Sequence, residues 1–482
     1  MLSIGGSAAA LIGNYNAAPS SVLGITVNPT SAGQLNVTGT ANVSSTQIAL
    51  HFTGLTGPNP FPAVTATGGV TASPLPPVSS DSLNPYFDFP IASLSNPNTL
   101  IISFPTPTVQ QLNNLYCTLF CGDTGGLTST GGTNQSNAIG GVGQLADALL
   151  LSGNAPALTN LFVTLRQLTP AQQVQFFQQV QPSQIGTALA LLAQELANNG
   201  GLTTSVDDHV YGMRNNVAGM GGGDEVGRGL TVWAKPYGET LTQNMKERVN
   251  GFTASVYGLA AGADTLVQPN VRVGAAMALS NANIKFSGSQ SGNTASDLLF
   301  QAGLYGSYFT NNFFVDGVGA IGLNWYNTKE SISAFGLQRT ANFQGVQFNA
   351  RLTAGYDWHA ANALVVTPSV TFQEIHMDAD AHQTQGGGMF DLNVAPQHID
   401  VRQLKFGSRA SYTVAQPNGW VLTPEVHAYY IRNLILTRVA TSATFTSGGG
   451  LTAYGPQRDA DLADLGLGMT IAQKGPFTLS AV

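Results

Sequence analysis

The sequence predicts a mainly β protein: a transmembrane antiparallel β-barrel of the outer-membrane type, with a pore helix, a preceding helical linker and an irregular β or solenoid-like N-terminal segment. Charged residues make up only 9% of the 482 residues, against about a quarter in soluble proteins. Mean hydropathy is near neutral, and no run of about eighteen apolar residues signals a membrane-spanning helix. From residue 230 onward apolar and polar residues alternate over long strands, as in a barrel with a polar inside and an apolar outside.

Residues 1–130 are expected to form irregular β structure or the end of a β-solenoid. They are rich in Ser, Thr, Asn, Gly and Pro, with short β-like runs such as LGITVNP and TLIISF between turn residues. No Lys or Arg precedes Arg166, and the acids of this part are Asp81, Asp88, Asp123 and Asp147. A region without cations cannot pair with phosphates, so we do not expect nucleic acid as a partner.

Cys117 and Cys121, in YCTLFC, are the two cysteines of the chain. We expect them to form a small disulfide loop in an oxidising compartment. A metal site would need more ligands, and no His lies nearby. The sequence predicts no metal and no cofactor.

Residues 131–222 are expected to be a glycine-rich linker followed by helices. LTNLFVTLRQL has apolar residues at helical spacing. In TPAQQVQFFQQVQP, Thr169 suits the N-cap, Pro170 the first helical position and Gln172 a capping box. A third helix covers SQIGTALALLAQELANNG, and LTTSVDDHVYGMRNN forms a shorter fourth.

Residues 226–482 are expected to form the barrel. The predicted strands lie near 230–243, 252–265, 271–286, 295–310, 312–327, 341–358, 362–377, 399–415, 419–436 and 460–473. They are about 10 to 16 residues long, whereas strands of soluble sandwiches run nearer five or six. Their connections alternate between short turns and long loops, which predicts periplasmic turns and a first strand that starts in the periplasm.

Both ends of the sequence suggest a fragment. MLSIGGSAAALIGNYN has no basic region and no apolar core of a signal peptide, so we expect the start to be missing. PFTLSAV would begin an eleventh strand, and bacterial single-chain barrels have even strand numbers. We therefore expect at least one more strand after the end of this sequence.

Residues from about 155 to 482 resemble the translocator unit of the type Va autotransporters, a family of type V secretion proteins. The resemblance rests on LTPAQQVQFFQQVQPSQ, then VWAKPYG, YGLAAGAD and RVGAAMALS, and finally LVVTPSVTF and WVLTPEVHAYY, in this order. It implies a twelve-stranded barrel with a helical segment through its pore, joined to an N-terminal passenger outside the cell. It also implies assembly by the outer-membrane barrel assembly machinery, with periplasmic chaperones.

A polar lumen is expected because a charge that faces lipid costs about 2–4 kcal/mol at the midplane. Alternation within LTVWAKPYGE then turns Trp233 and Tyr237 inward beside Lys235. The predicted lumen-facing residues are Trp233, Lys235, Tyr237, Arg272, Arg351, Gln403, Lys405, Arg409, Glu425 and His427. Asp207, Asp208 and Arg214 of the fourth helix are expected to pair with the charged ones, although generic lumen polarity explains the pattern equally well.

Catalytic chemistry is not predicted. The first 165 residues contain one histidine, His51, and neither a GxSxG motif nor a basic residue. Some members of the resembling family release their passenger by cyclisation of an Asn in the pore; Asn215-Asn216 is compatible, but more simply ends a helix. HMDADAH, with His376 and His382, is interpreted as a solvated loop and not as a cation site.

The sequence thus predicts a monomeric barrel in the outer membrane of a Gram-negative bacterium, in contact with its lipid. Its expected function is to secrete and anchor its own adhesin-like N-terminal passenger at the cell surface. One alternative is a porin-like channel with a periplasmic N-terminal domain. Another is the translocator of a secreted enzyme encoded upstream of residue 1.

Overall fold

The computed structural model describes residues 1–120, 127–183, 185–198, 200–215, 223–225, 229–361, 363–416 and 420–473. The chain divides into two compact units. The first comprises residues 1–130, 139–174 and 447–449, and the second comprises residues 131–138, 175–446 and 450–482. None of the described helices is both long and apolar enough to cross a membrane.

The N-terminal residues form three sets of parallel strands, stacked as a β-solenoid. Its strands are β1 (Leu2–Ile4), β2 (Ala8–Leu11), β3 (Tyr15–Asn16), β4 (Ser21–Val27), β5 (Gln34–Val37), β6 (Ala41–Asn42), β7 (Thr46–Phe52), β8 (Phe61–Ala66), β9 (Val70–Thr71) and β10 (Val78–Ser80). The parallel orders are β1-β4-β7-β10, β2-β5-β8 and β3-β6-β9. The expectation of a solenoid-like segment is therefore confirmed.

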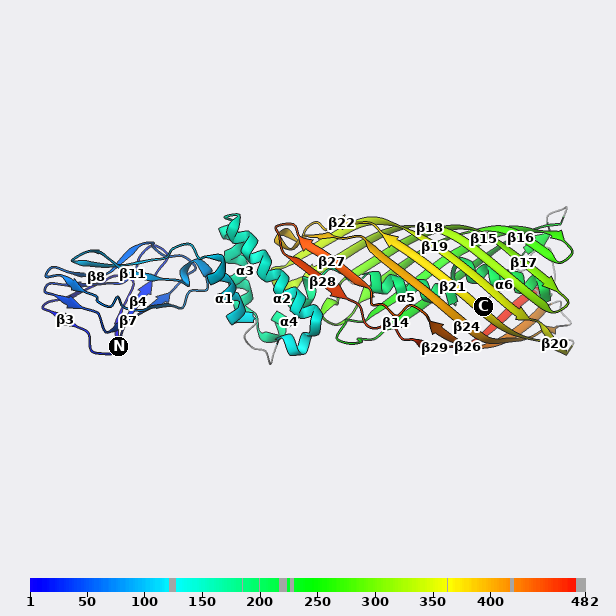
Figure 1. Ribbon diagram of the computed structural model, residues 1–482, viewed down its shortest axis with the longest axis horizontal. Coiled ribbons are helices and arrows are strands. Elements are labelled where there is room, and N and C mark those ends of the chain that lie inside the picture. Colours follow the sequence, from blue (N-terminus) through cyan, green and yellow to red (C-terminus); the bar gives the residue numbers. More distant parts are fainter. Residues whose placement is uncertain are drawn as a thin grey trace. The chain divides into compact units, whose positions relative to one another are not determined.

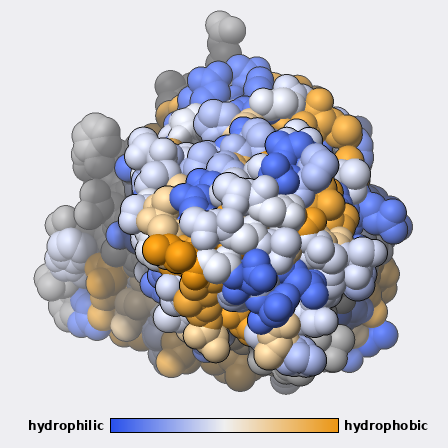
Figure 2. Space-filling view, turned by 90° about the vertical axis from the view of Figure 1, so that its left-hand side faces the viewer, coloured by the Kyte–Doolittle hydropathy of each residue, from blue (hydrophilic) through white to orange (hydrophobic). Residues whose placement is uncertain are grey.

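The solenoid has no fixed sequence period because its turns differ in length. Ser21 pairs with Thr46, 25 residues on, whereas Ile48 pairs with Val78, 30 residues on. Side chains such as Leu23 and Leu100 fill its apolar core. The hairpin β11 (Ile91–Asn96) and β12 (Thr99–Ser103) then joins β8 in antiparallel fashion, after the 3₁₀ turn η1 (Pro85–Phe87). In Figure 2, the surface that faces the viewer consists mainly of residues of neutral or hydrophilic hydropathy, with hydrophobic residues in small groups.

Helices begin earlier than the sequence predicted. They are α1 (Val109–Phe120), α2 (Leu127–Leu151), α3 (Ala155–Gln167), α4 (Pro170–Gln179), α5 (Ile185–Asn198) and α6 (Gly201–Asn215). The last four correspond to the predicted helical segments, and Thr169 and Gln172 form the expected capping box. The β-rich assignment of residues 109–120 and the linker assignment of residues 131–151 were wrong. Buried Leu145 and Leu149 of α2 show why: packing overrides the low helix propensity of its glycines.

Ten long antiparallel strands within the described residues form one continuous sheet in sequence order. They are β14 (Leu230–Gln243), β15 (Phe252–Gln268), β16 (Val271–Phe286), β17 (Thr294–Thr310), β18 (Phe313–Ile332), β19 (Leu337–Tyr356), β21 (Leu364–Ala379), β24 (Gln397–Tyr412), β26 (Trp420–Asn433) and β29 (Asp461–Gln473). Short strands β13 (Gly223–Glu225), β20 (Trp358–Ala361) and β25 (Val414–Ala415) pair at its margins. The sheet curves around α5 and α6 as a barrel (Figure 1). The predicted segment PFTLSAV lies outside the described residues.

Connections between the long strands mostly alternate in length as predicted, but the long loop expected between β18 and β19 is a four-residue connection, because both strands extend further than the sequence predicted. Two-residue turns join β15 to β16 and β17 to β18, at what we call the short-turn end. Residues 380–396 and 434–460 connect strands at the opposite, long-loop end. Two ion pairs there bring the β14–β15 loop to the residues before β29, Lys246 with Asp459 at 2.8 Å and Glu247 with Arg438 at 2.6 Å. The loops at this end thus hold the first and last long strands near each other.

A small sheet made by the long loops lies at the same end. Its order is β22 (His382–Gln383), β23 (Leu392–Val394), β27 (Ala440–Phe445) and β28 (Gly450–Tyr454). The 3₁₀ turns η2 (Gly288–Gln290), η3 (Ser333–Phe335) and η4 (Gly388–Phe390) belong to neighbouring loops. Phe335 and Phe390 pack edge to face with ring centroids 4.7 Å apart, and Phe176 lies 5.5 Å from each. We call the small sheet and these aromatic rings the lid.

The lumen is not uniformly polar, and in this the sequence expectation was wrong. α5 lies nearer the lid and α6 nearer β20 (Figure 1). Around α5 the inward side chains are apolar, including Phe252, Ile284, Met377 and Val401. We call this region the apolar half, and the region around α6 the charged half. The polar-lumen prediction failed here because the sequence analysis did not place α5 in the pore. α5 supplies an apolar surface against which these inward side chains pack.

Candidate functional site in the barrel lumen

α6 has two faces that match two sides of the lumen. Leu202, Val206 and Val210 recur every four residues and therefore form one stripe. This stripe packs against small inward residues of β15, β16 and β18, such as Ala260 and Ala276. Its charged side chains contact other parts of the wall: Asp207 contacts β19, Asp208 contacts β14 and β24, and Arg214 contacts β18. A helix buried on nearly all sides needs both kinds of partner.

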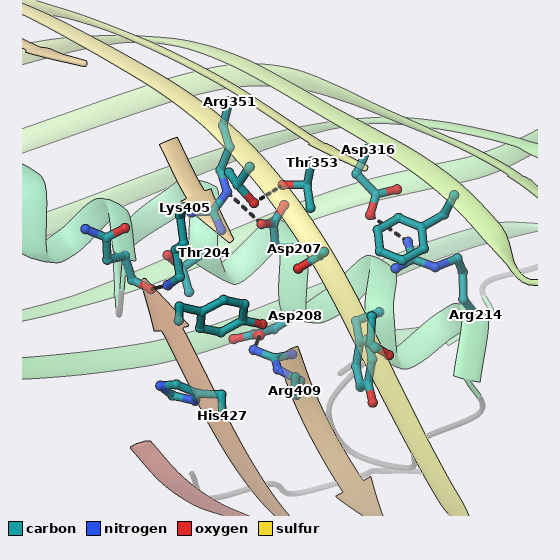
Figure 3. Close-up of a pocket in the computed structure, with 17 residues that line it drawn as sticks. Thr204, Asp207, Asp208, Arg214, Asp316, Arg351, Thr353, Lys405, Arg409 and His427 are labelled. Carbon is teal, nitrogen blue, oxygen red and sulfur yellow. Dashed lines mark hydrogen bonds and ion pairs between the residues drawn. The ribbon is translucent and has the colours of Figure 1, made fainter. Parts of the chain in front are cut away.

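Two adjacent carboxylates of α6 each contact cations of the barrel wall. Asp208 lies 2.5 Å from Lys235 of β14 and 2.7 Å from Arg409 of β24. Asp207 lies 2.7 Å from Arg351 of β19. Figure 3 shows Asp207 directed to Arg351 and Asp208 to Arg409. Because these pairs radiate from one helix to three different strands, they fix both its rotation and its depth in the lumen.

The C-terminal turn of α6 carries a cation that contacts the wall near the short-turn end. Arg214 lies 2.6 Å from Asp316 of β18 and 3.0 Å from Asp357. Its guanidinium also sits over the ring of Phe314, 3.7 Å from the centroid. A cation suits this place because the last turn of a helix presents unpaired carbonyl groups. The side chains of this cluster are at most 7% exposed.

A buried network surrounds His209 on the side of α6 that faces β14 to β17. Nε2 of His209 lies 2.5 Å from the carboxylate of Asp264. Asp264 also contacts Arg272 and accepts a hydrogen bond of 2.6 Å from Tyr305. Tyr305 in turn accepts a 2.8 Å bond from the indole N–H of Trp233. The network therefore ties α6 to β14, β15, β16 and β17.

Glycines on β15 make room for the two aromatic residues that flank Lys235. Trp233 faces Gly262, and Tyr237 faces Gly258, in the strand register. A Cβ added at Gly262 would lie 2.7 Å from the Trp233 ring, and one at Gly258 would lie 2.5 Å from Tyr237. Both rings therefore lie flat across the neighbouring strand and point into the lumen.

The wall on the other side carries further charges. Lys405 lies 2.7 Å from Asp464 of β29, and His427 lies 3.1 Å from the same carboxylate. Nζ of Lys405 also donates to the backbone oxygen of Asn198, 3.4 Å away, at the end of α5. Gln403 accepts a 3.2 Å bond from the Asn198 side chain. The end of α5 is thus tied to the same strands as α6.

The space left in the charged half is small. A cavity of about 70 Å³ lies among Asp207, Asp208, Arg351, Lys405 and Arg409 (Figure 3). It is polar and large enough for a few water molecules. Beside α6 the lumen therefore has room for water only, and a second cavity of about 120 Å³ lies beside α5, where Leu191 and Gln243 are among its lining residues.

Arg339 holds the chain where it enters the barrel at the long-loop end. Its side chain is fully buried and pairs with Glu330. The guanidinium donates to the backbone oxygens of Gln179 and Val180, at 3.3 and 3.1 Å, and to that of Gln181. Gln179 ends α4 and the other two residues follow it, so these carbonyls lack helical partners. One strand residue therefore caps α4 from the barrel side.

All ten predicted lumen residues lie on inward-facing positions. Asp207, Asp208 and Arg214 contact charged partners there, and Glu425 is 3.9 Å from Arg409. Asn215 ends α6, where its side chain donates to the Tyr211 oxygen at 3.2 Å, and Asn216 lies outside the described residues. Cys117 is exposed on α1, while Cys121 lies outside the described residues, so the disulfide and the cleavage site stay predictions.

Several partners were not singled out from the sequence. They are Asp264, Asp316, Asp357, Asp464, His209 and Arg339. Asp264, Asp316 and Asp464 occupy inward strand positions, so strict alternation could have identified them. In HMDADAH, His376 and Asp378 face outward and pair with Asp400 and His398 across β24. Within the described ranges, no three His, Cys, Asp or Glu side chains are arranged to hold a metal ion.

Comparison with known proteins gives three kinds of match. The model of the autotransporter β-domain family matches residues 232–481, just over half of the chain. Outer membrane protein B of Rickettsia japonica is 26% identical over 227 residues, 45% of this chain and 14% of that protein. The same protein of Rickettsia prowazekii is 25% identical over 252 residues, 51% of this chain and 15% of that protein. The chain thus spans about one seventh of the length of these relatives.

Solved structures of similar proteins include two translocator units. The translocator domain of the autotransporter NalP from Neisseria meningitidis has a TM-score of 0.38 and 12% identity, covering 57% of this chain and 92% of that one. The transport unit of the autotransporter AIDA-I from Escherichia coli has a TM-score of 0.35 and 16% identity, covering 57% and 95%.

Proposed function

Because this chain belongs to the autotransporter family, we propose that it carries its own N-terminal region across the outer membrane and then keeps it anchored at the cell surface. The observation that supports this most is the lumen filled by α5 and α6, the segment that connects the N-terminal region to β14. A chain that had passed through the barrel and stopped would leave its last segment there. The short-turn end would face the periplasm, as in other outer-membrane barrels.

Anchoring without release follows from how the connecting segment is held. Arg339 caps the exit of α4 at the lid, and the charges of α6 pair with β14, β18, β19 and β24. To withdraw α6, several desolvated ion pairs would have to separate together, and each removal of a buried partner typically costs about 3–5 kcal/mol. We propose that the solenoid remains displayed as an adhesin-like stem, and that this chain performs no reaction chemistry.

Conductance tests the filled lumen. The full-length chain, folded into planar bilayers, should conduct weakly or not at all, whereas a variant without residues 155–216 should open a steady pore. Equal conductance of the two proteins would favour the porin-like alternative. The cavity of about 70 Å³ between helix and wall already weighs against a wide channel.

Display is tested on intact cells. Added protease should cut residues 1–130 of cell-bound protein, while a periplasmic control protein stays intact. Protection of these residues in cells that make the protein would contradict surface display. Asn215→Ala tests cleavage at Asn215. If cells expressing this variant release as much solenoid into the medium as cells expressing wild type, cleavage at Asn215 is excluded. We further propose that the barrel is monomeric and that its insertion requires periplasmic chaperones and the barrel assembly machinery, so depletion of that machinery should leave residues 1–130 protected.

A further inference from the structure

One outward-facing row of side chains across β15 to β19 contains only hydroxyl and ammonium groups. The strand register aligns Thr253 with Lys285, Lys285 with Thr294, Thr294 with Lys329 and Lys329 with Thr340. All five side chains are exposed. Their neighbours along each strand, such as Ile284 and Phe286 beside Lys285, point into the lumen. The row therefore lies on the outer wall.

A second row of hydroxyl and amide side chains runs beside the first, two residues nearer the short-turn end. It consists of Ser255, Asn283, Ser296, Asn327 and Asn342. Asn327 donates to Asn342 at 2.5 Å. We call the two rows together the polar wall. Next along the strands come Tyr257 and Trp325, and then exposed Leu279, Phe300 and Leu323.

This order places the polar wall beside a membrane boundary. Outer-membrane barrels carry an apolar band flanked by aromatic residues at both interfaces. Tyr257 and Trp325 occupy the aromatic position on the long-loop side of that band. The polar wall follows immediately, so it lies at the level of the head groups of the outer leaflet.

The two lysines of the polar wall differ from the other lysines of the described chain. Lys235, Lys246 and Lys405 each lie 2.5 to 2.8 Å from a carboxylate. Across the described ranges, neither Lys285 nor Lys329 has an ion pair or a hydrogen bond from its ammonium group. Two uncompensated cations in one row would attract an anion to the face between them.

The spacing of these cations suits one phosphate group. They lie two strands apart, which separates their Cα atoms by about 9–10 Å. Each ammonium sits on a flexible four-carbon stem and offers three donors. Both can therefore reach an anion placed over Thr294, whose hydroxyl is a further donor. The adjoining amides and hydroxyls can donate to, and accept from, sugar hydroxyls.

We propose that the polar wall binds the phosphorylated sugar head group of a glycolipid of the outer leaflet. The outward face of β21 and β24 offers a contrast, because its charges are already paired across the strands: Glu374 with Arg402, His376 with Asp400 and Asp378 with His398. Lipid phosphate is thus bound on one side of the barrel. The inference needs the outer-membrane location, but it does not depend on export of the N-terminal region.

The test compares full-length wild type with K285Q/K329Q, both folded in zwitterionic detergent micelles. The probe is lipid A with both phosphates, and its binding is measured by native mass spectrometry. A lysine near an anionic head group contributes about fivefold to affinity, so the double variant should bind about 25-fold more weakly. K285R/K329R should bind like wild type, because it keeps both charges.

K246Q is the matched control, since Lys246 is a partly exposed lysine of the long-loop end that lies 2.8 Å from Asp459 and outside the polar wall. It should bind like wild type, and heat-modifiable migration on gels should show that all variants are folded. Wild type should bind dephosphorylated lipid A as weakly as K285Q/K329Q binds the phosphorylated form. Equal binding of phosphorylated lipid by K285Q/K329Q and wild type would overturn the proposal, as would full competition by millimolar inorganic phosphate.

Discussion

The apolar half and the charged half of the lumen are built on the same strands but hold their helices differently. β24 contributes Ile399 and Val401 to the apolar half, and Lys405 and Arg409 to the charged half. Apolar packing around α5 is non-directional and excludes water over a broad surface. The ion pairs of α6 have defined partners on defined strands. The difference suggests that α5 seals the lumen and α6 sets the position of the segment.

The division also fixes the direction of the segment. If α5 and α6 exchanged places, Asp207 and Asp208 would lie among residues such as Phe252 and Ile284. A buried carboxylate without a partner costs several kcal/mol. An apolar helix followed by a charged one therefore fits this lumen only if the chain enters at the long-loop end and leaves at the short-turn end.

The largest effect is expected in the charged half, from Asp208→Ala. This substitution leaves Lys235 and Arg409 without their shared carboxylate in a poorly solvated lumen. Removal of one partner from a buried ion pair typically destabilises by about 3–5 kcal/mol. The free energy of unfolding, measured by urea titration in lipid vesicles, should fall by this amount.

Asp459→Ala provides the matched control for that substitution. Asp459 is also paired with a lysine, Lys246 at 2.8 Å, but its side chain is 65% exposed. Exposed pairs contribute about 0–1 kcal/mol. Similar losses from Asp208→Ala and Asp459→Ala would mean that the charged half is as well solvated as the surface.

The next effect is expected in the apolar half, from Leu192→Ala. Leu192 is 3% exposed and packs in the cluster around α5. Truncation of a buried leucine to alanine costs about 2–5 kcal/mol, depending on how far the site collapses. We expect about 3 kcal/mol because the strands around it form one continuous sheet and can move little. Urea titration checks the value.

Salt distinguishes the two halves in that experiment. Raising ionic strength screens charges but leaves apolar packing intact, so the loss caused by Leu192→Ala should be constant between low and high salt. Partly exposed Leu191 is the control position, and Leu191→Ala should cost clearly less. Equal costs at the two positions would mean that α5 does not present one specific face to the wall.

Much of this arrangement could be predicted from the sequence, but the division of the lumen could not. Alternation and turn spacing identified all ten long strands, and the inward direction of Lys235 followed from the cost of charge in lipid. Phe252 and Ile284 occupy inward positions too. An apolar residue at such a position does not by itself predict an apolar lumen, because its packing partner is unknown from the sequence. That partner, α5, is distant in sequence, and only tertiary packing brings it into the pore.

A smaller effect is expected from pH at the rim of the apolar half. His382 of β22 stacks on Phe343, with ring centroids 3.7 Å apart, and burial lowers the pKa of His382 below its usual value near 6.5. Its contribution to stability is therefore complete above about pH 6.5 and is lost as pH falls toward the folded-state pKa. We therefore expect the free energy of unfolding to fall between pH 7 and pH 5.

His382→Phe keeps a ring against Phe343 but cannot be protonated. Comparison of urea titrations of this variant and wild type at both pH values isolates the contribution of His382 from that of other histidines. The wild-type protein should lose more of its free energy of unfolding than the variant on acidification. An identical pH response of the two proteins would show that the His382 ring is solvated and not part of the apolar half.

The smallest effect is the coupling between the two halves themselves. Leu192 belongs to the apolar cluster around α5, whereas Asp208 pairs with Lys235 and Arg409. Substitutions at separate sites usually add within about 0.3–0.5 kcal/mol. A double-mutant cycle of Asp208→Ala with Leu192→Ala should therefore give a coupling energy within that range. The cycle of Asp208→Ala with Arg409→Ala is the positive control, because these side chains lie 2.7 Å apart and should couple more strongly. A coupling above about 1 kcal/mol between Asp208 and Leu192 would mean that α5 and α6 move as one rigid plug. Sealing and positioning would then be properties of the whole segment, and the lumen would have one functional unit in place of two halves.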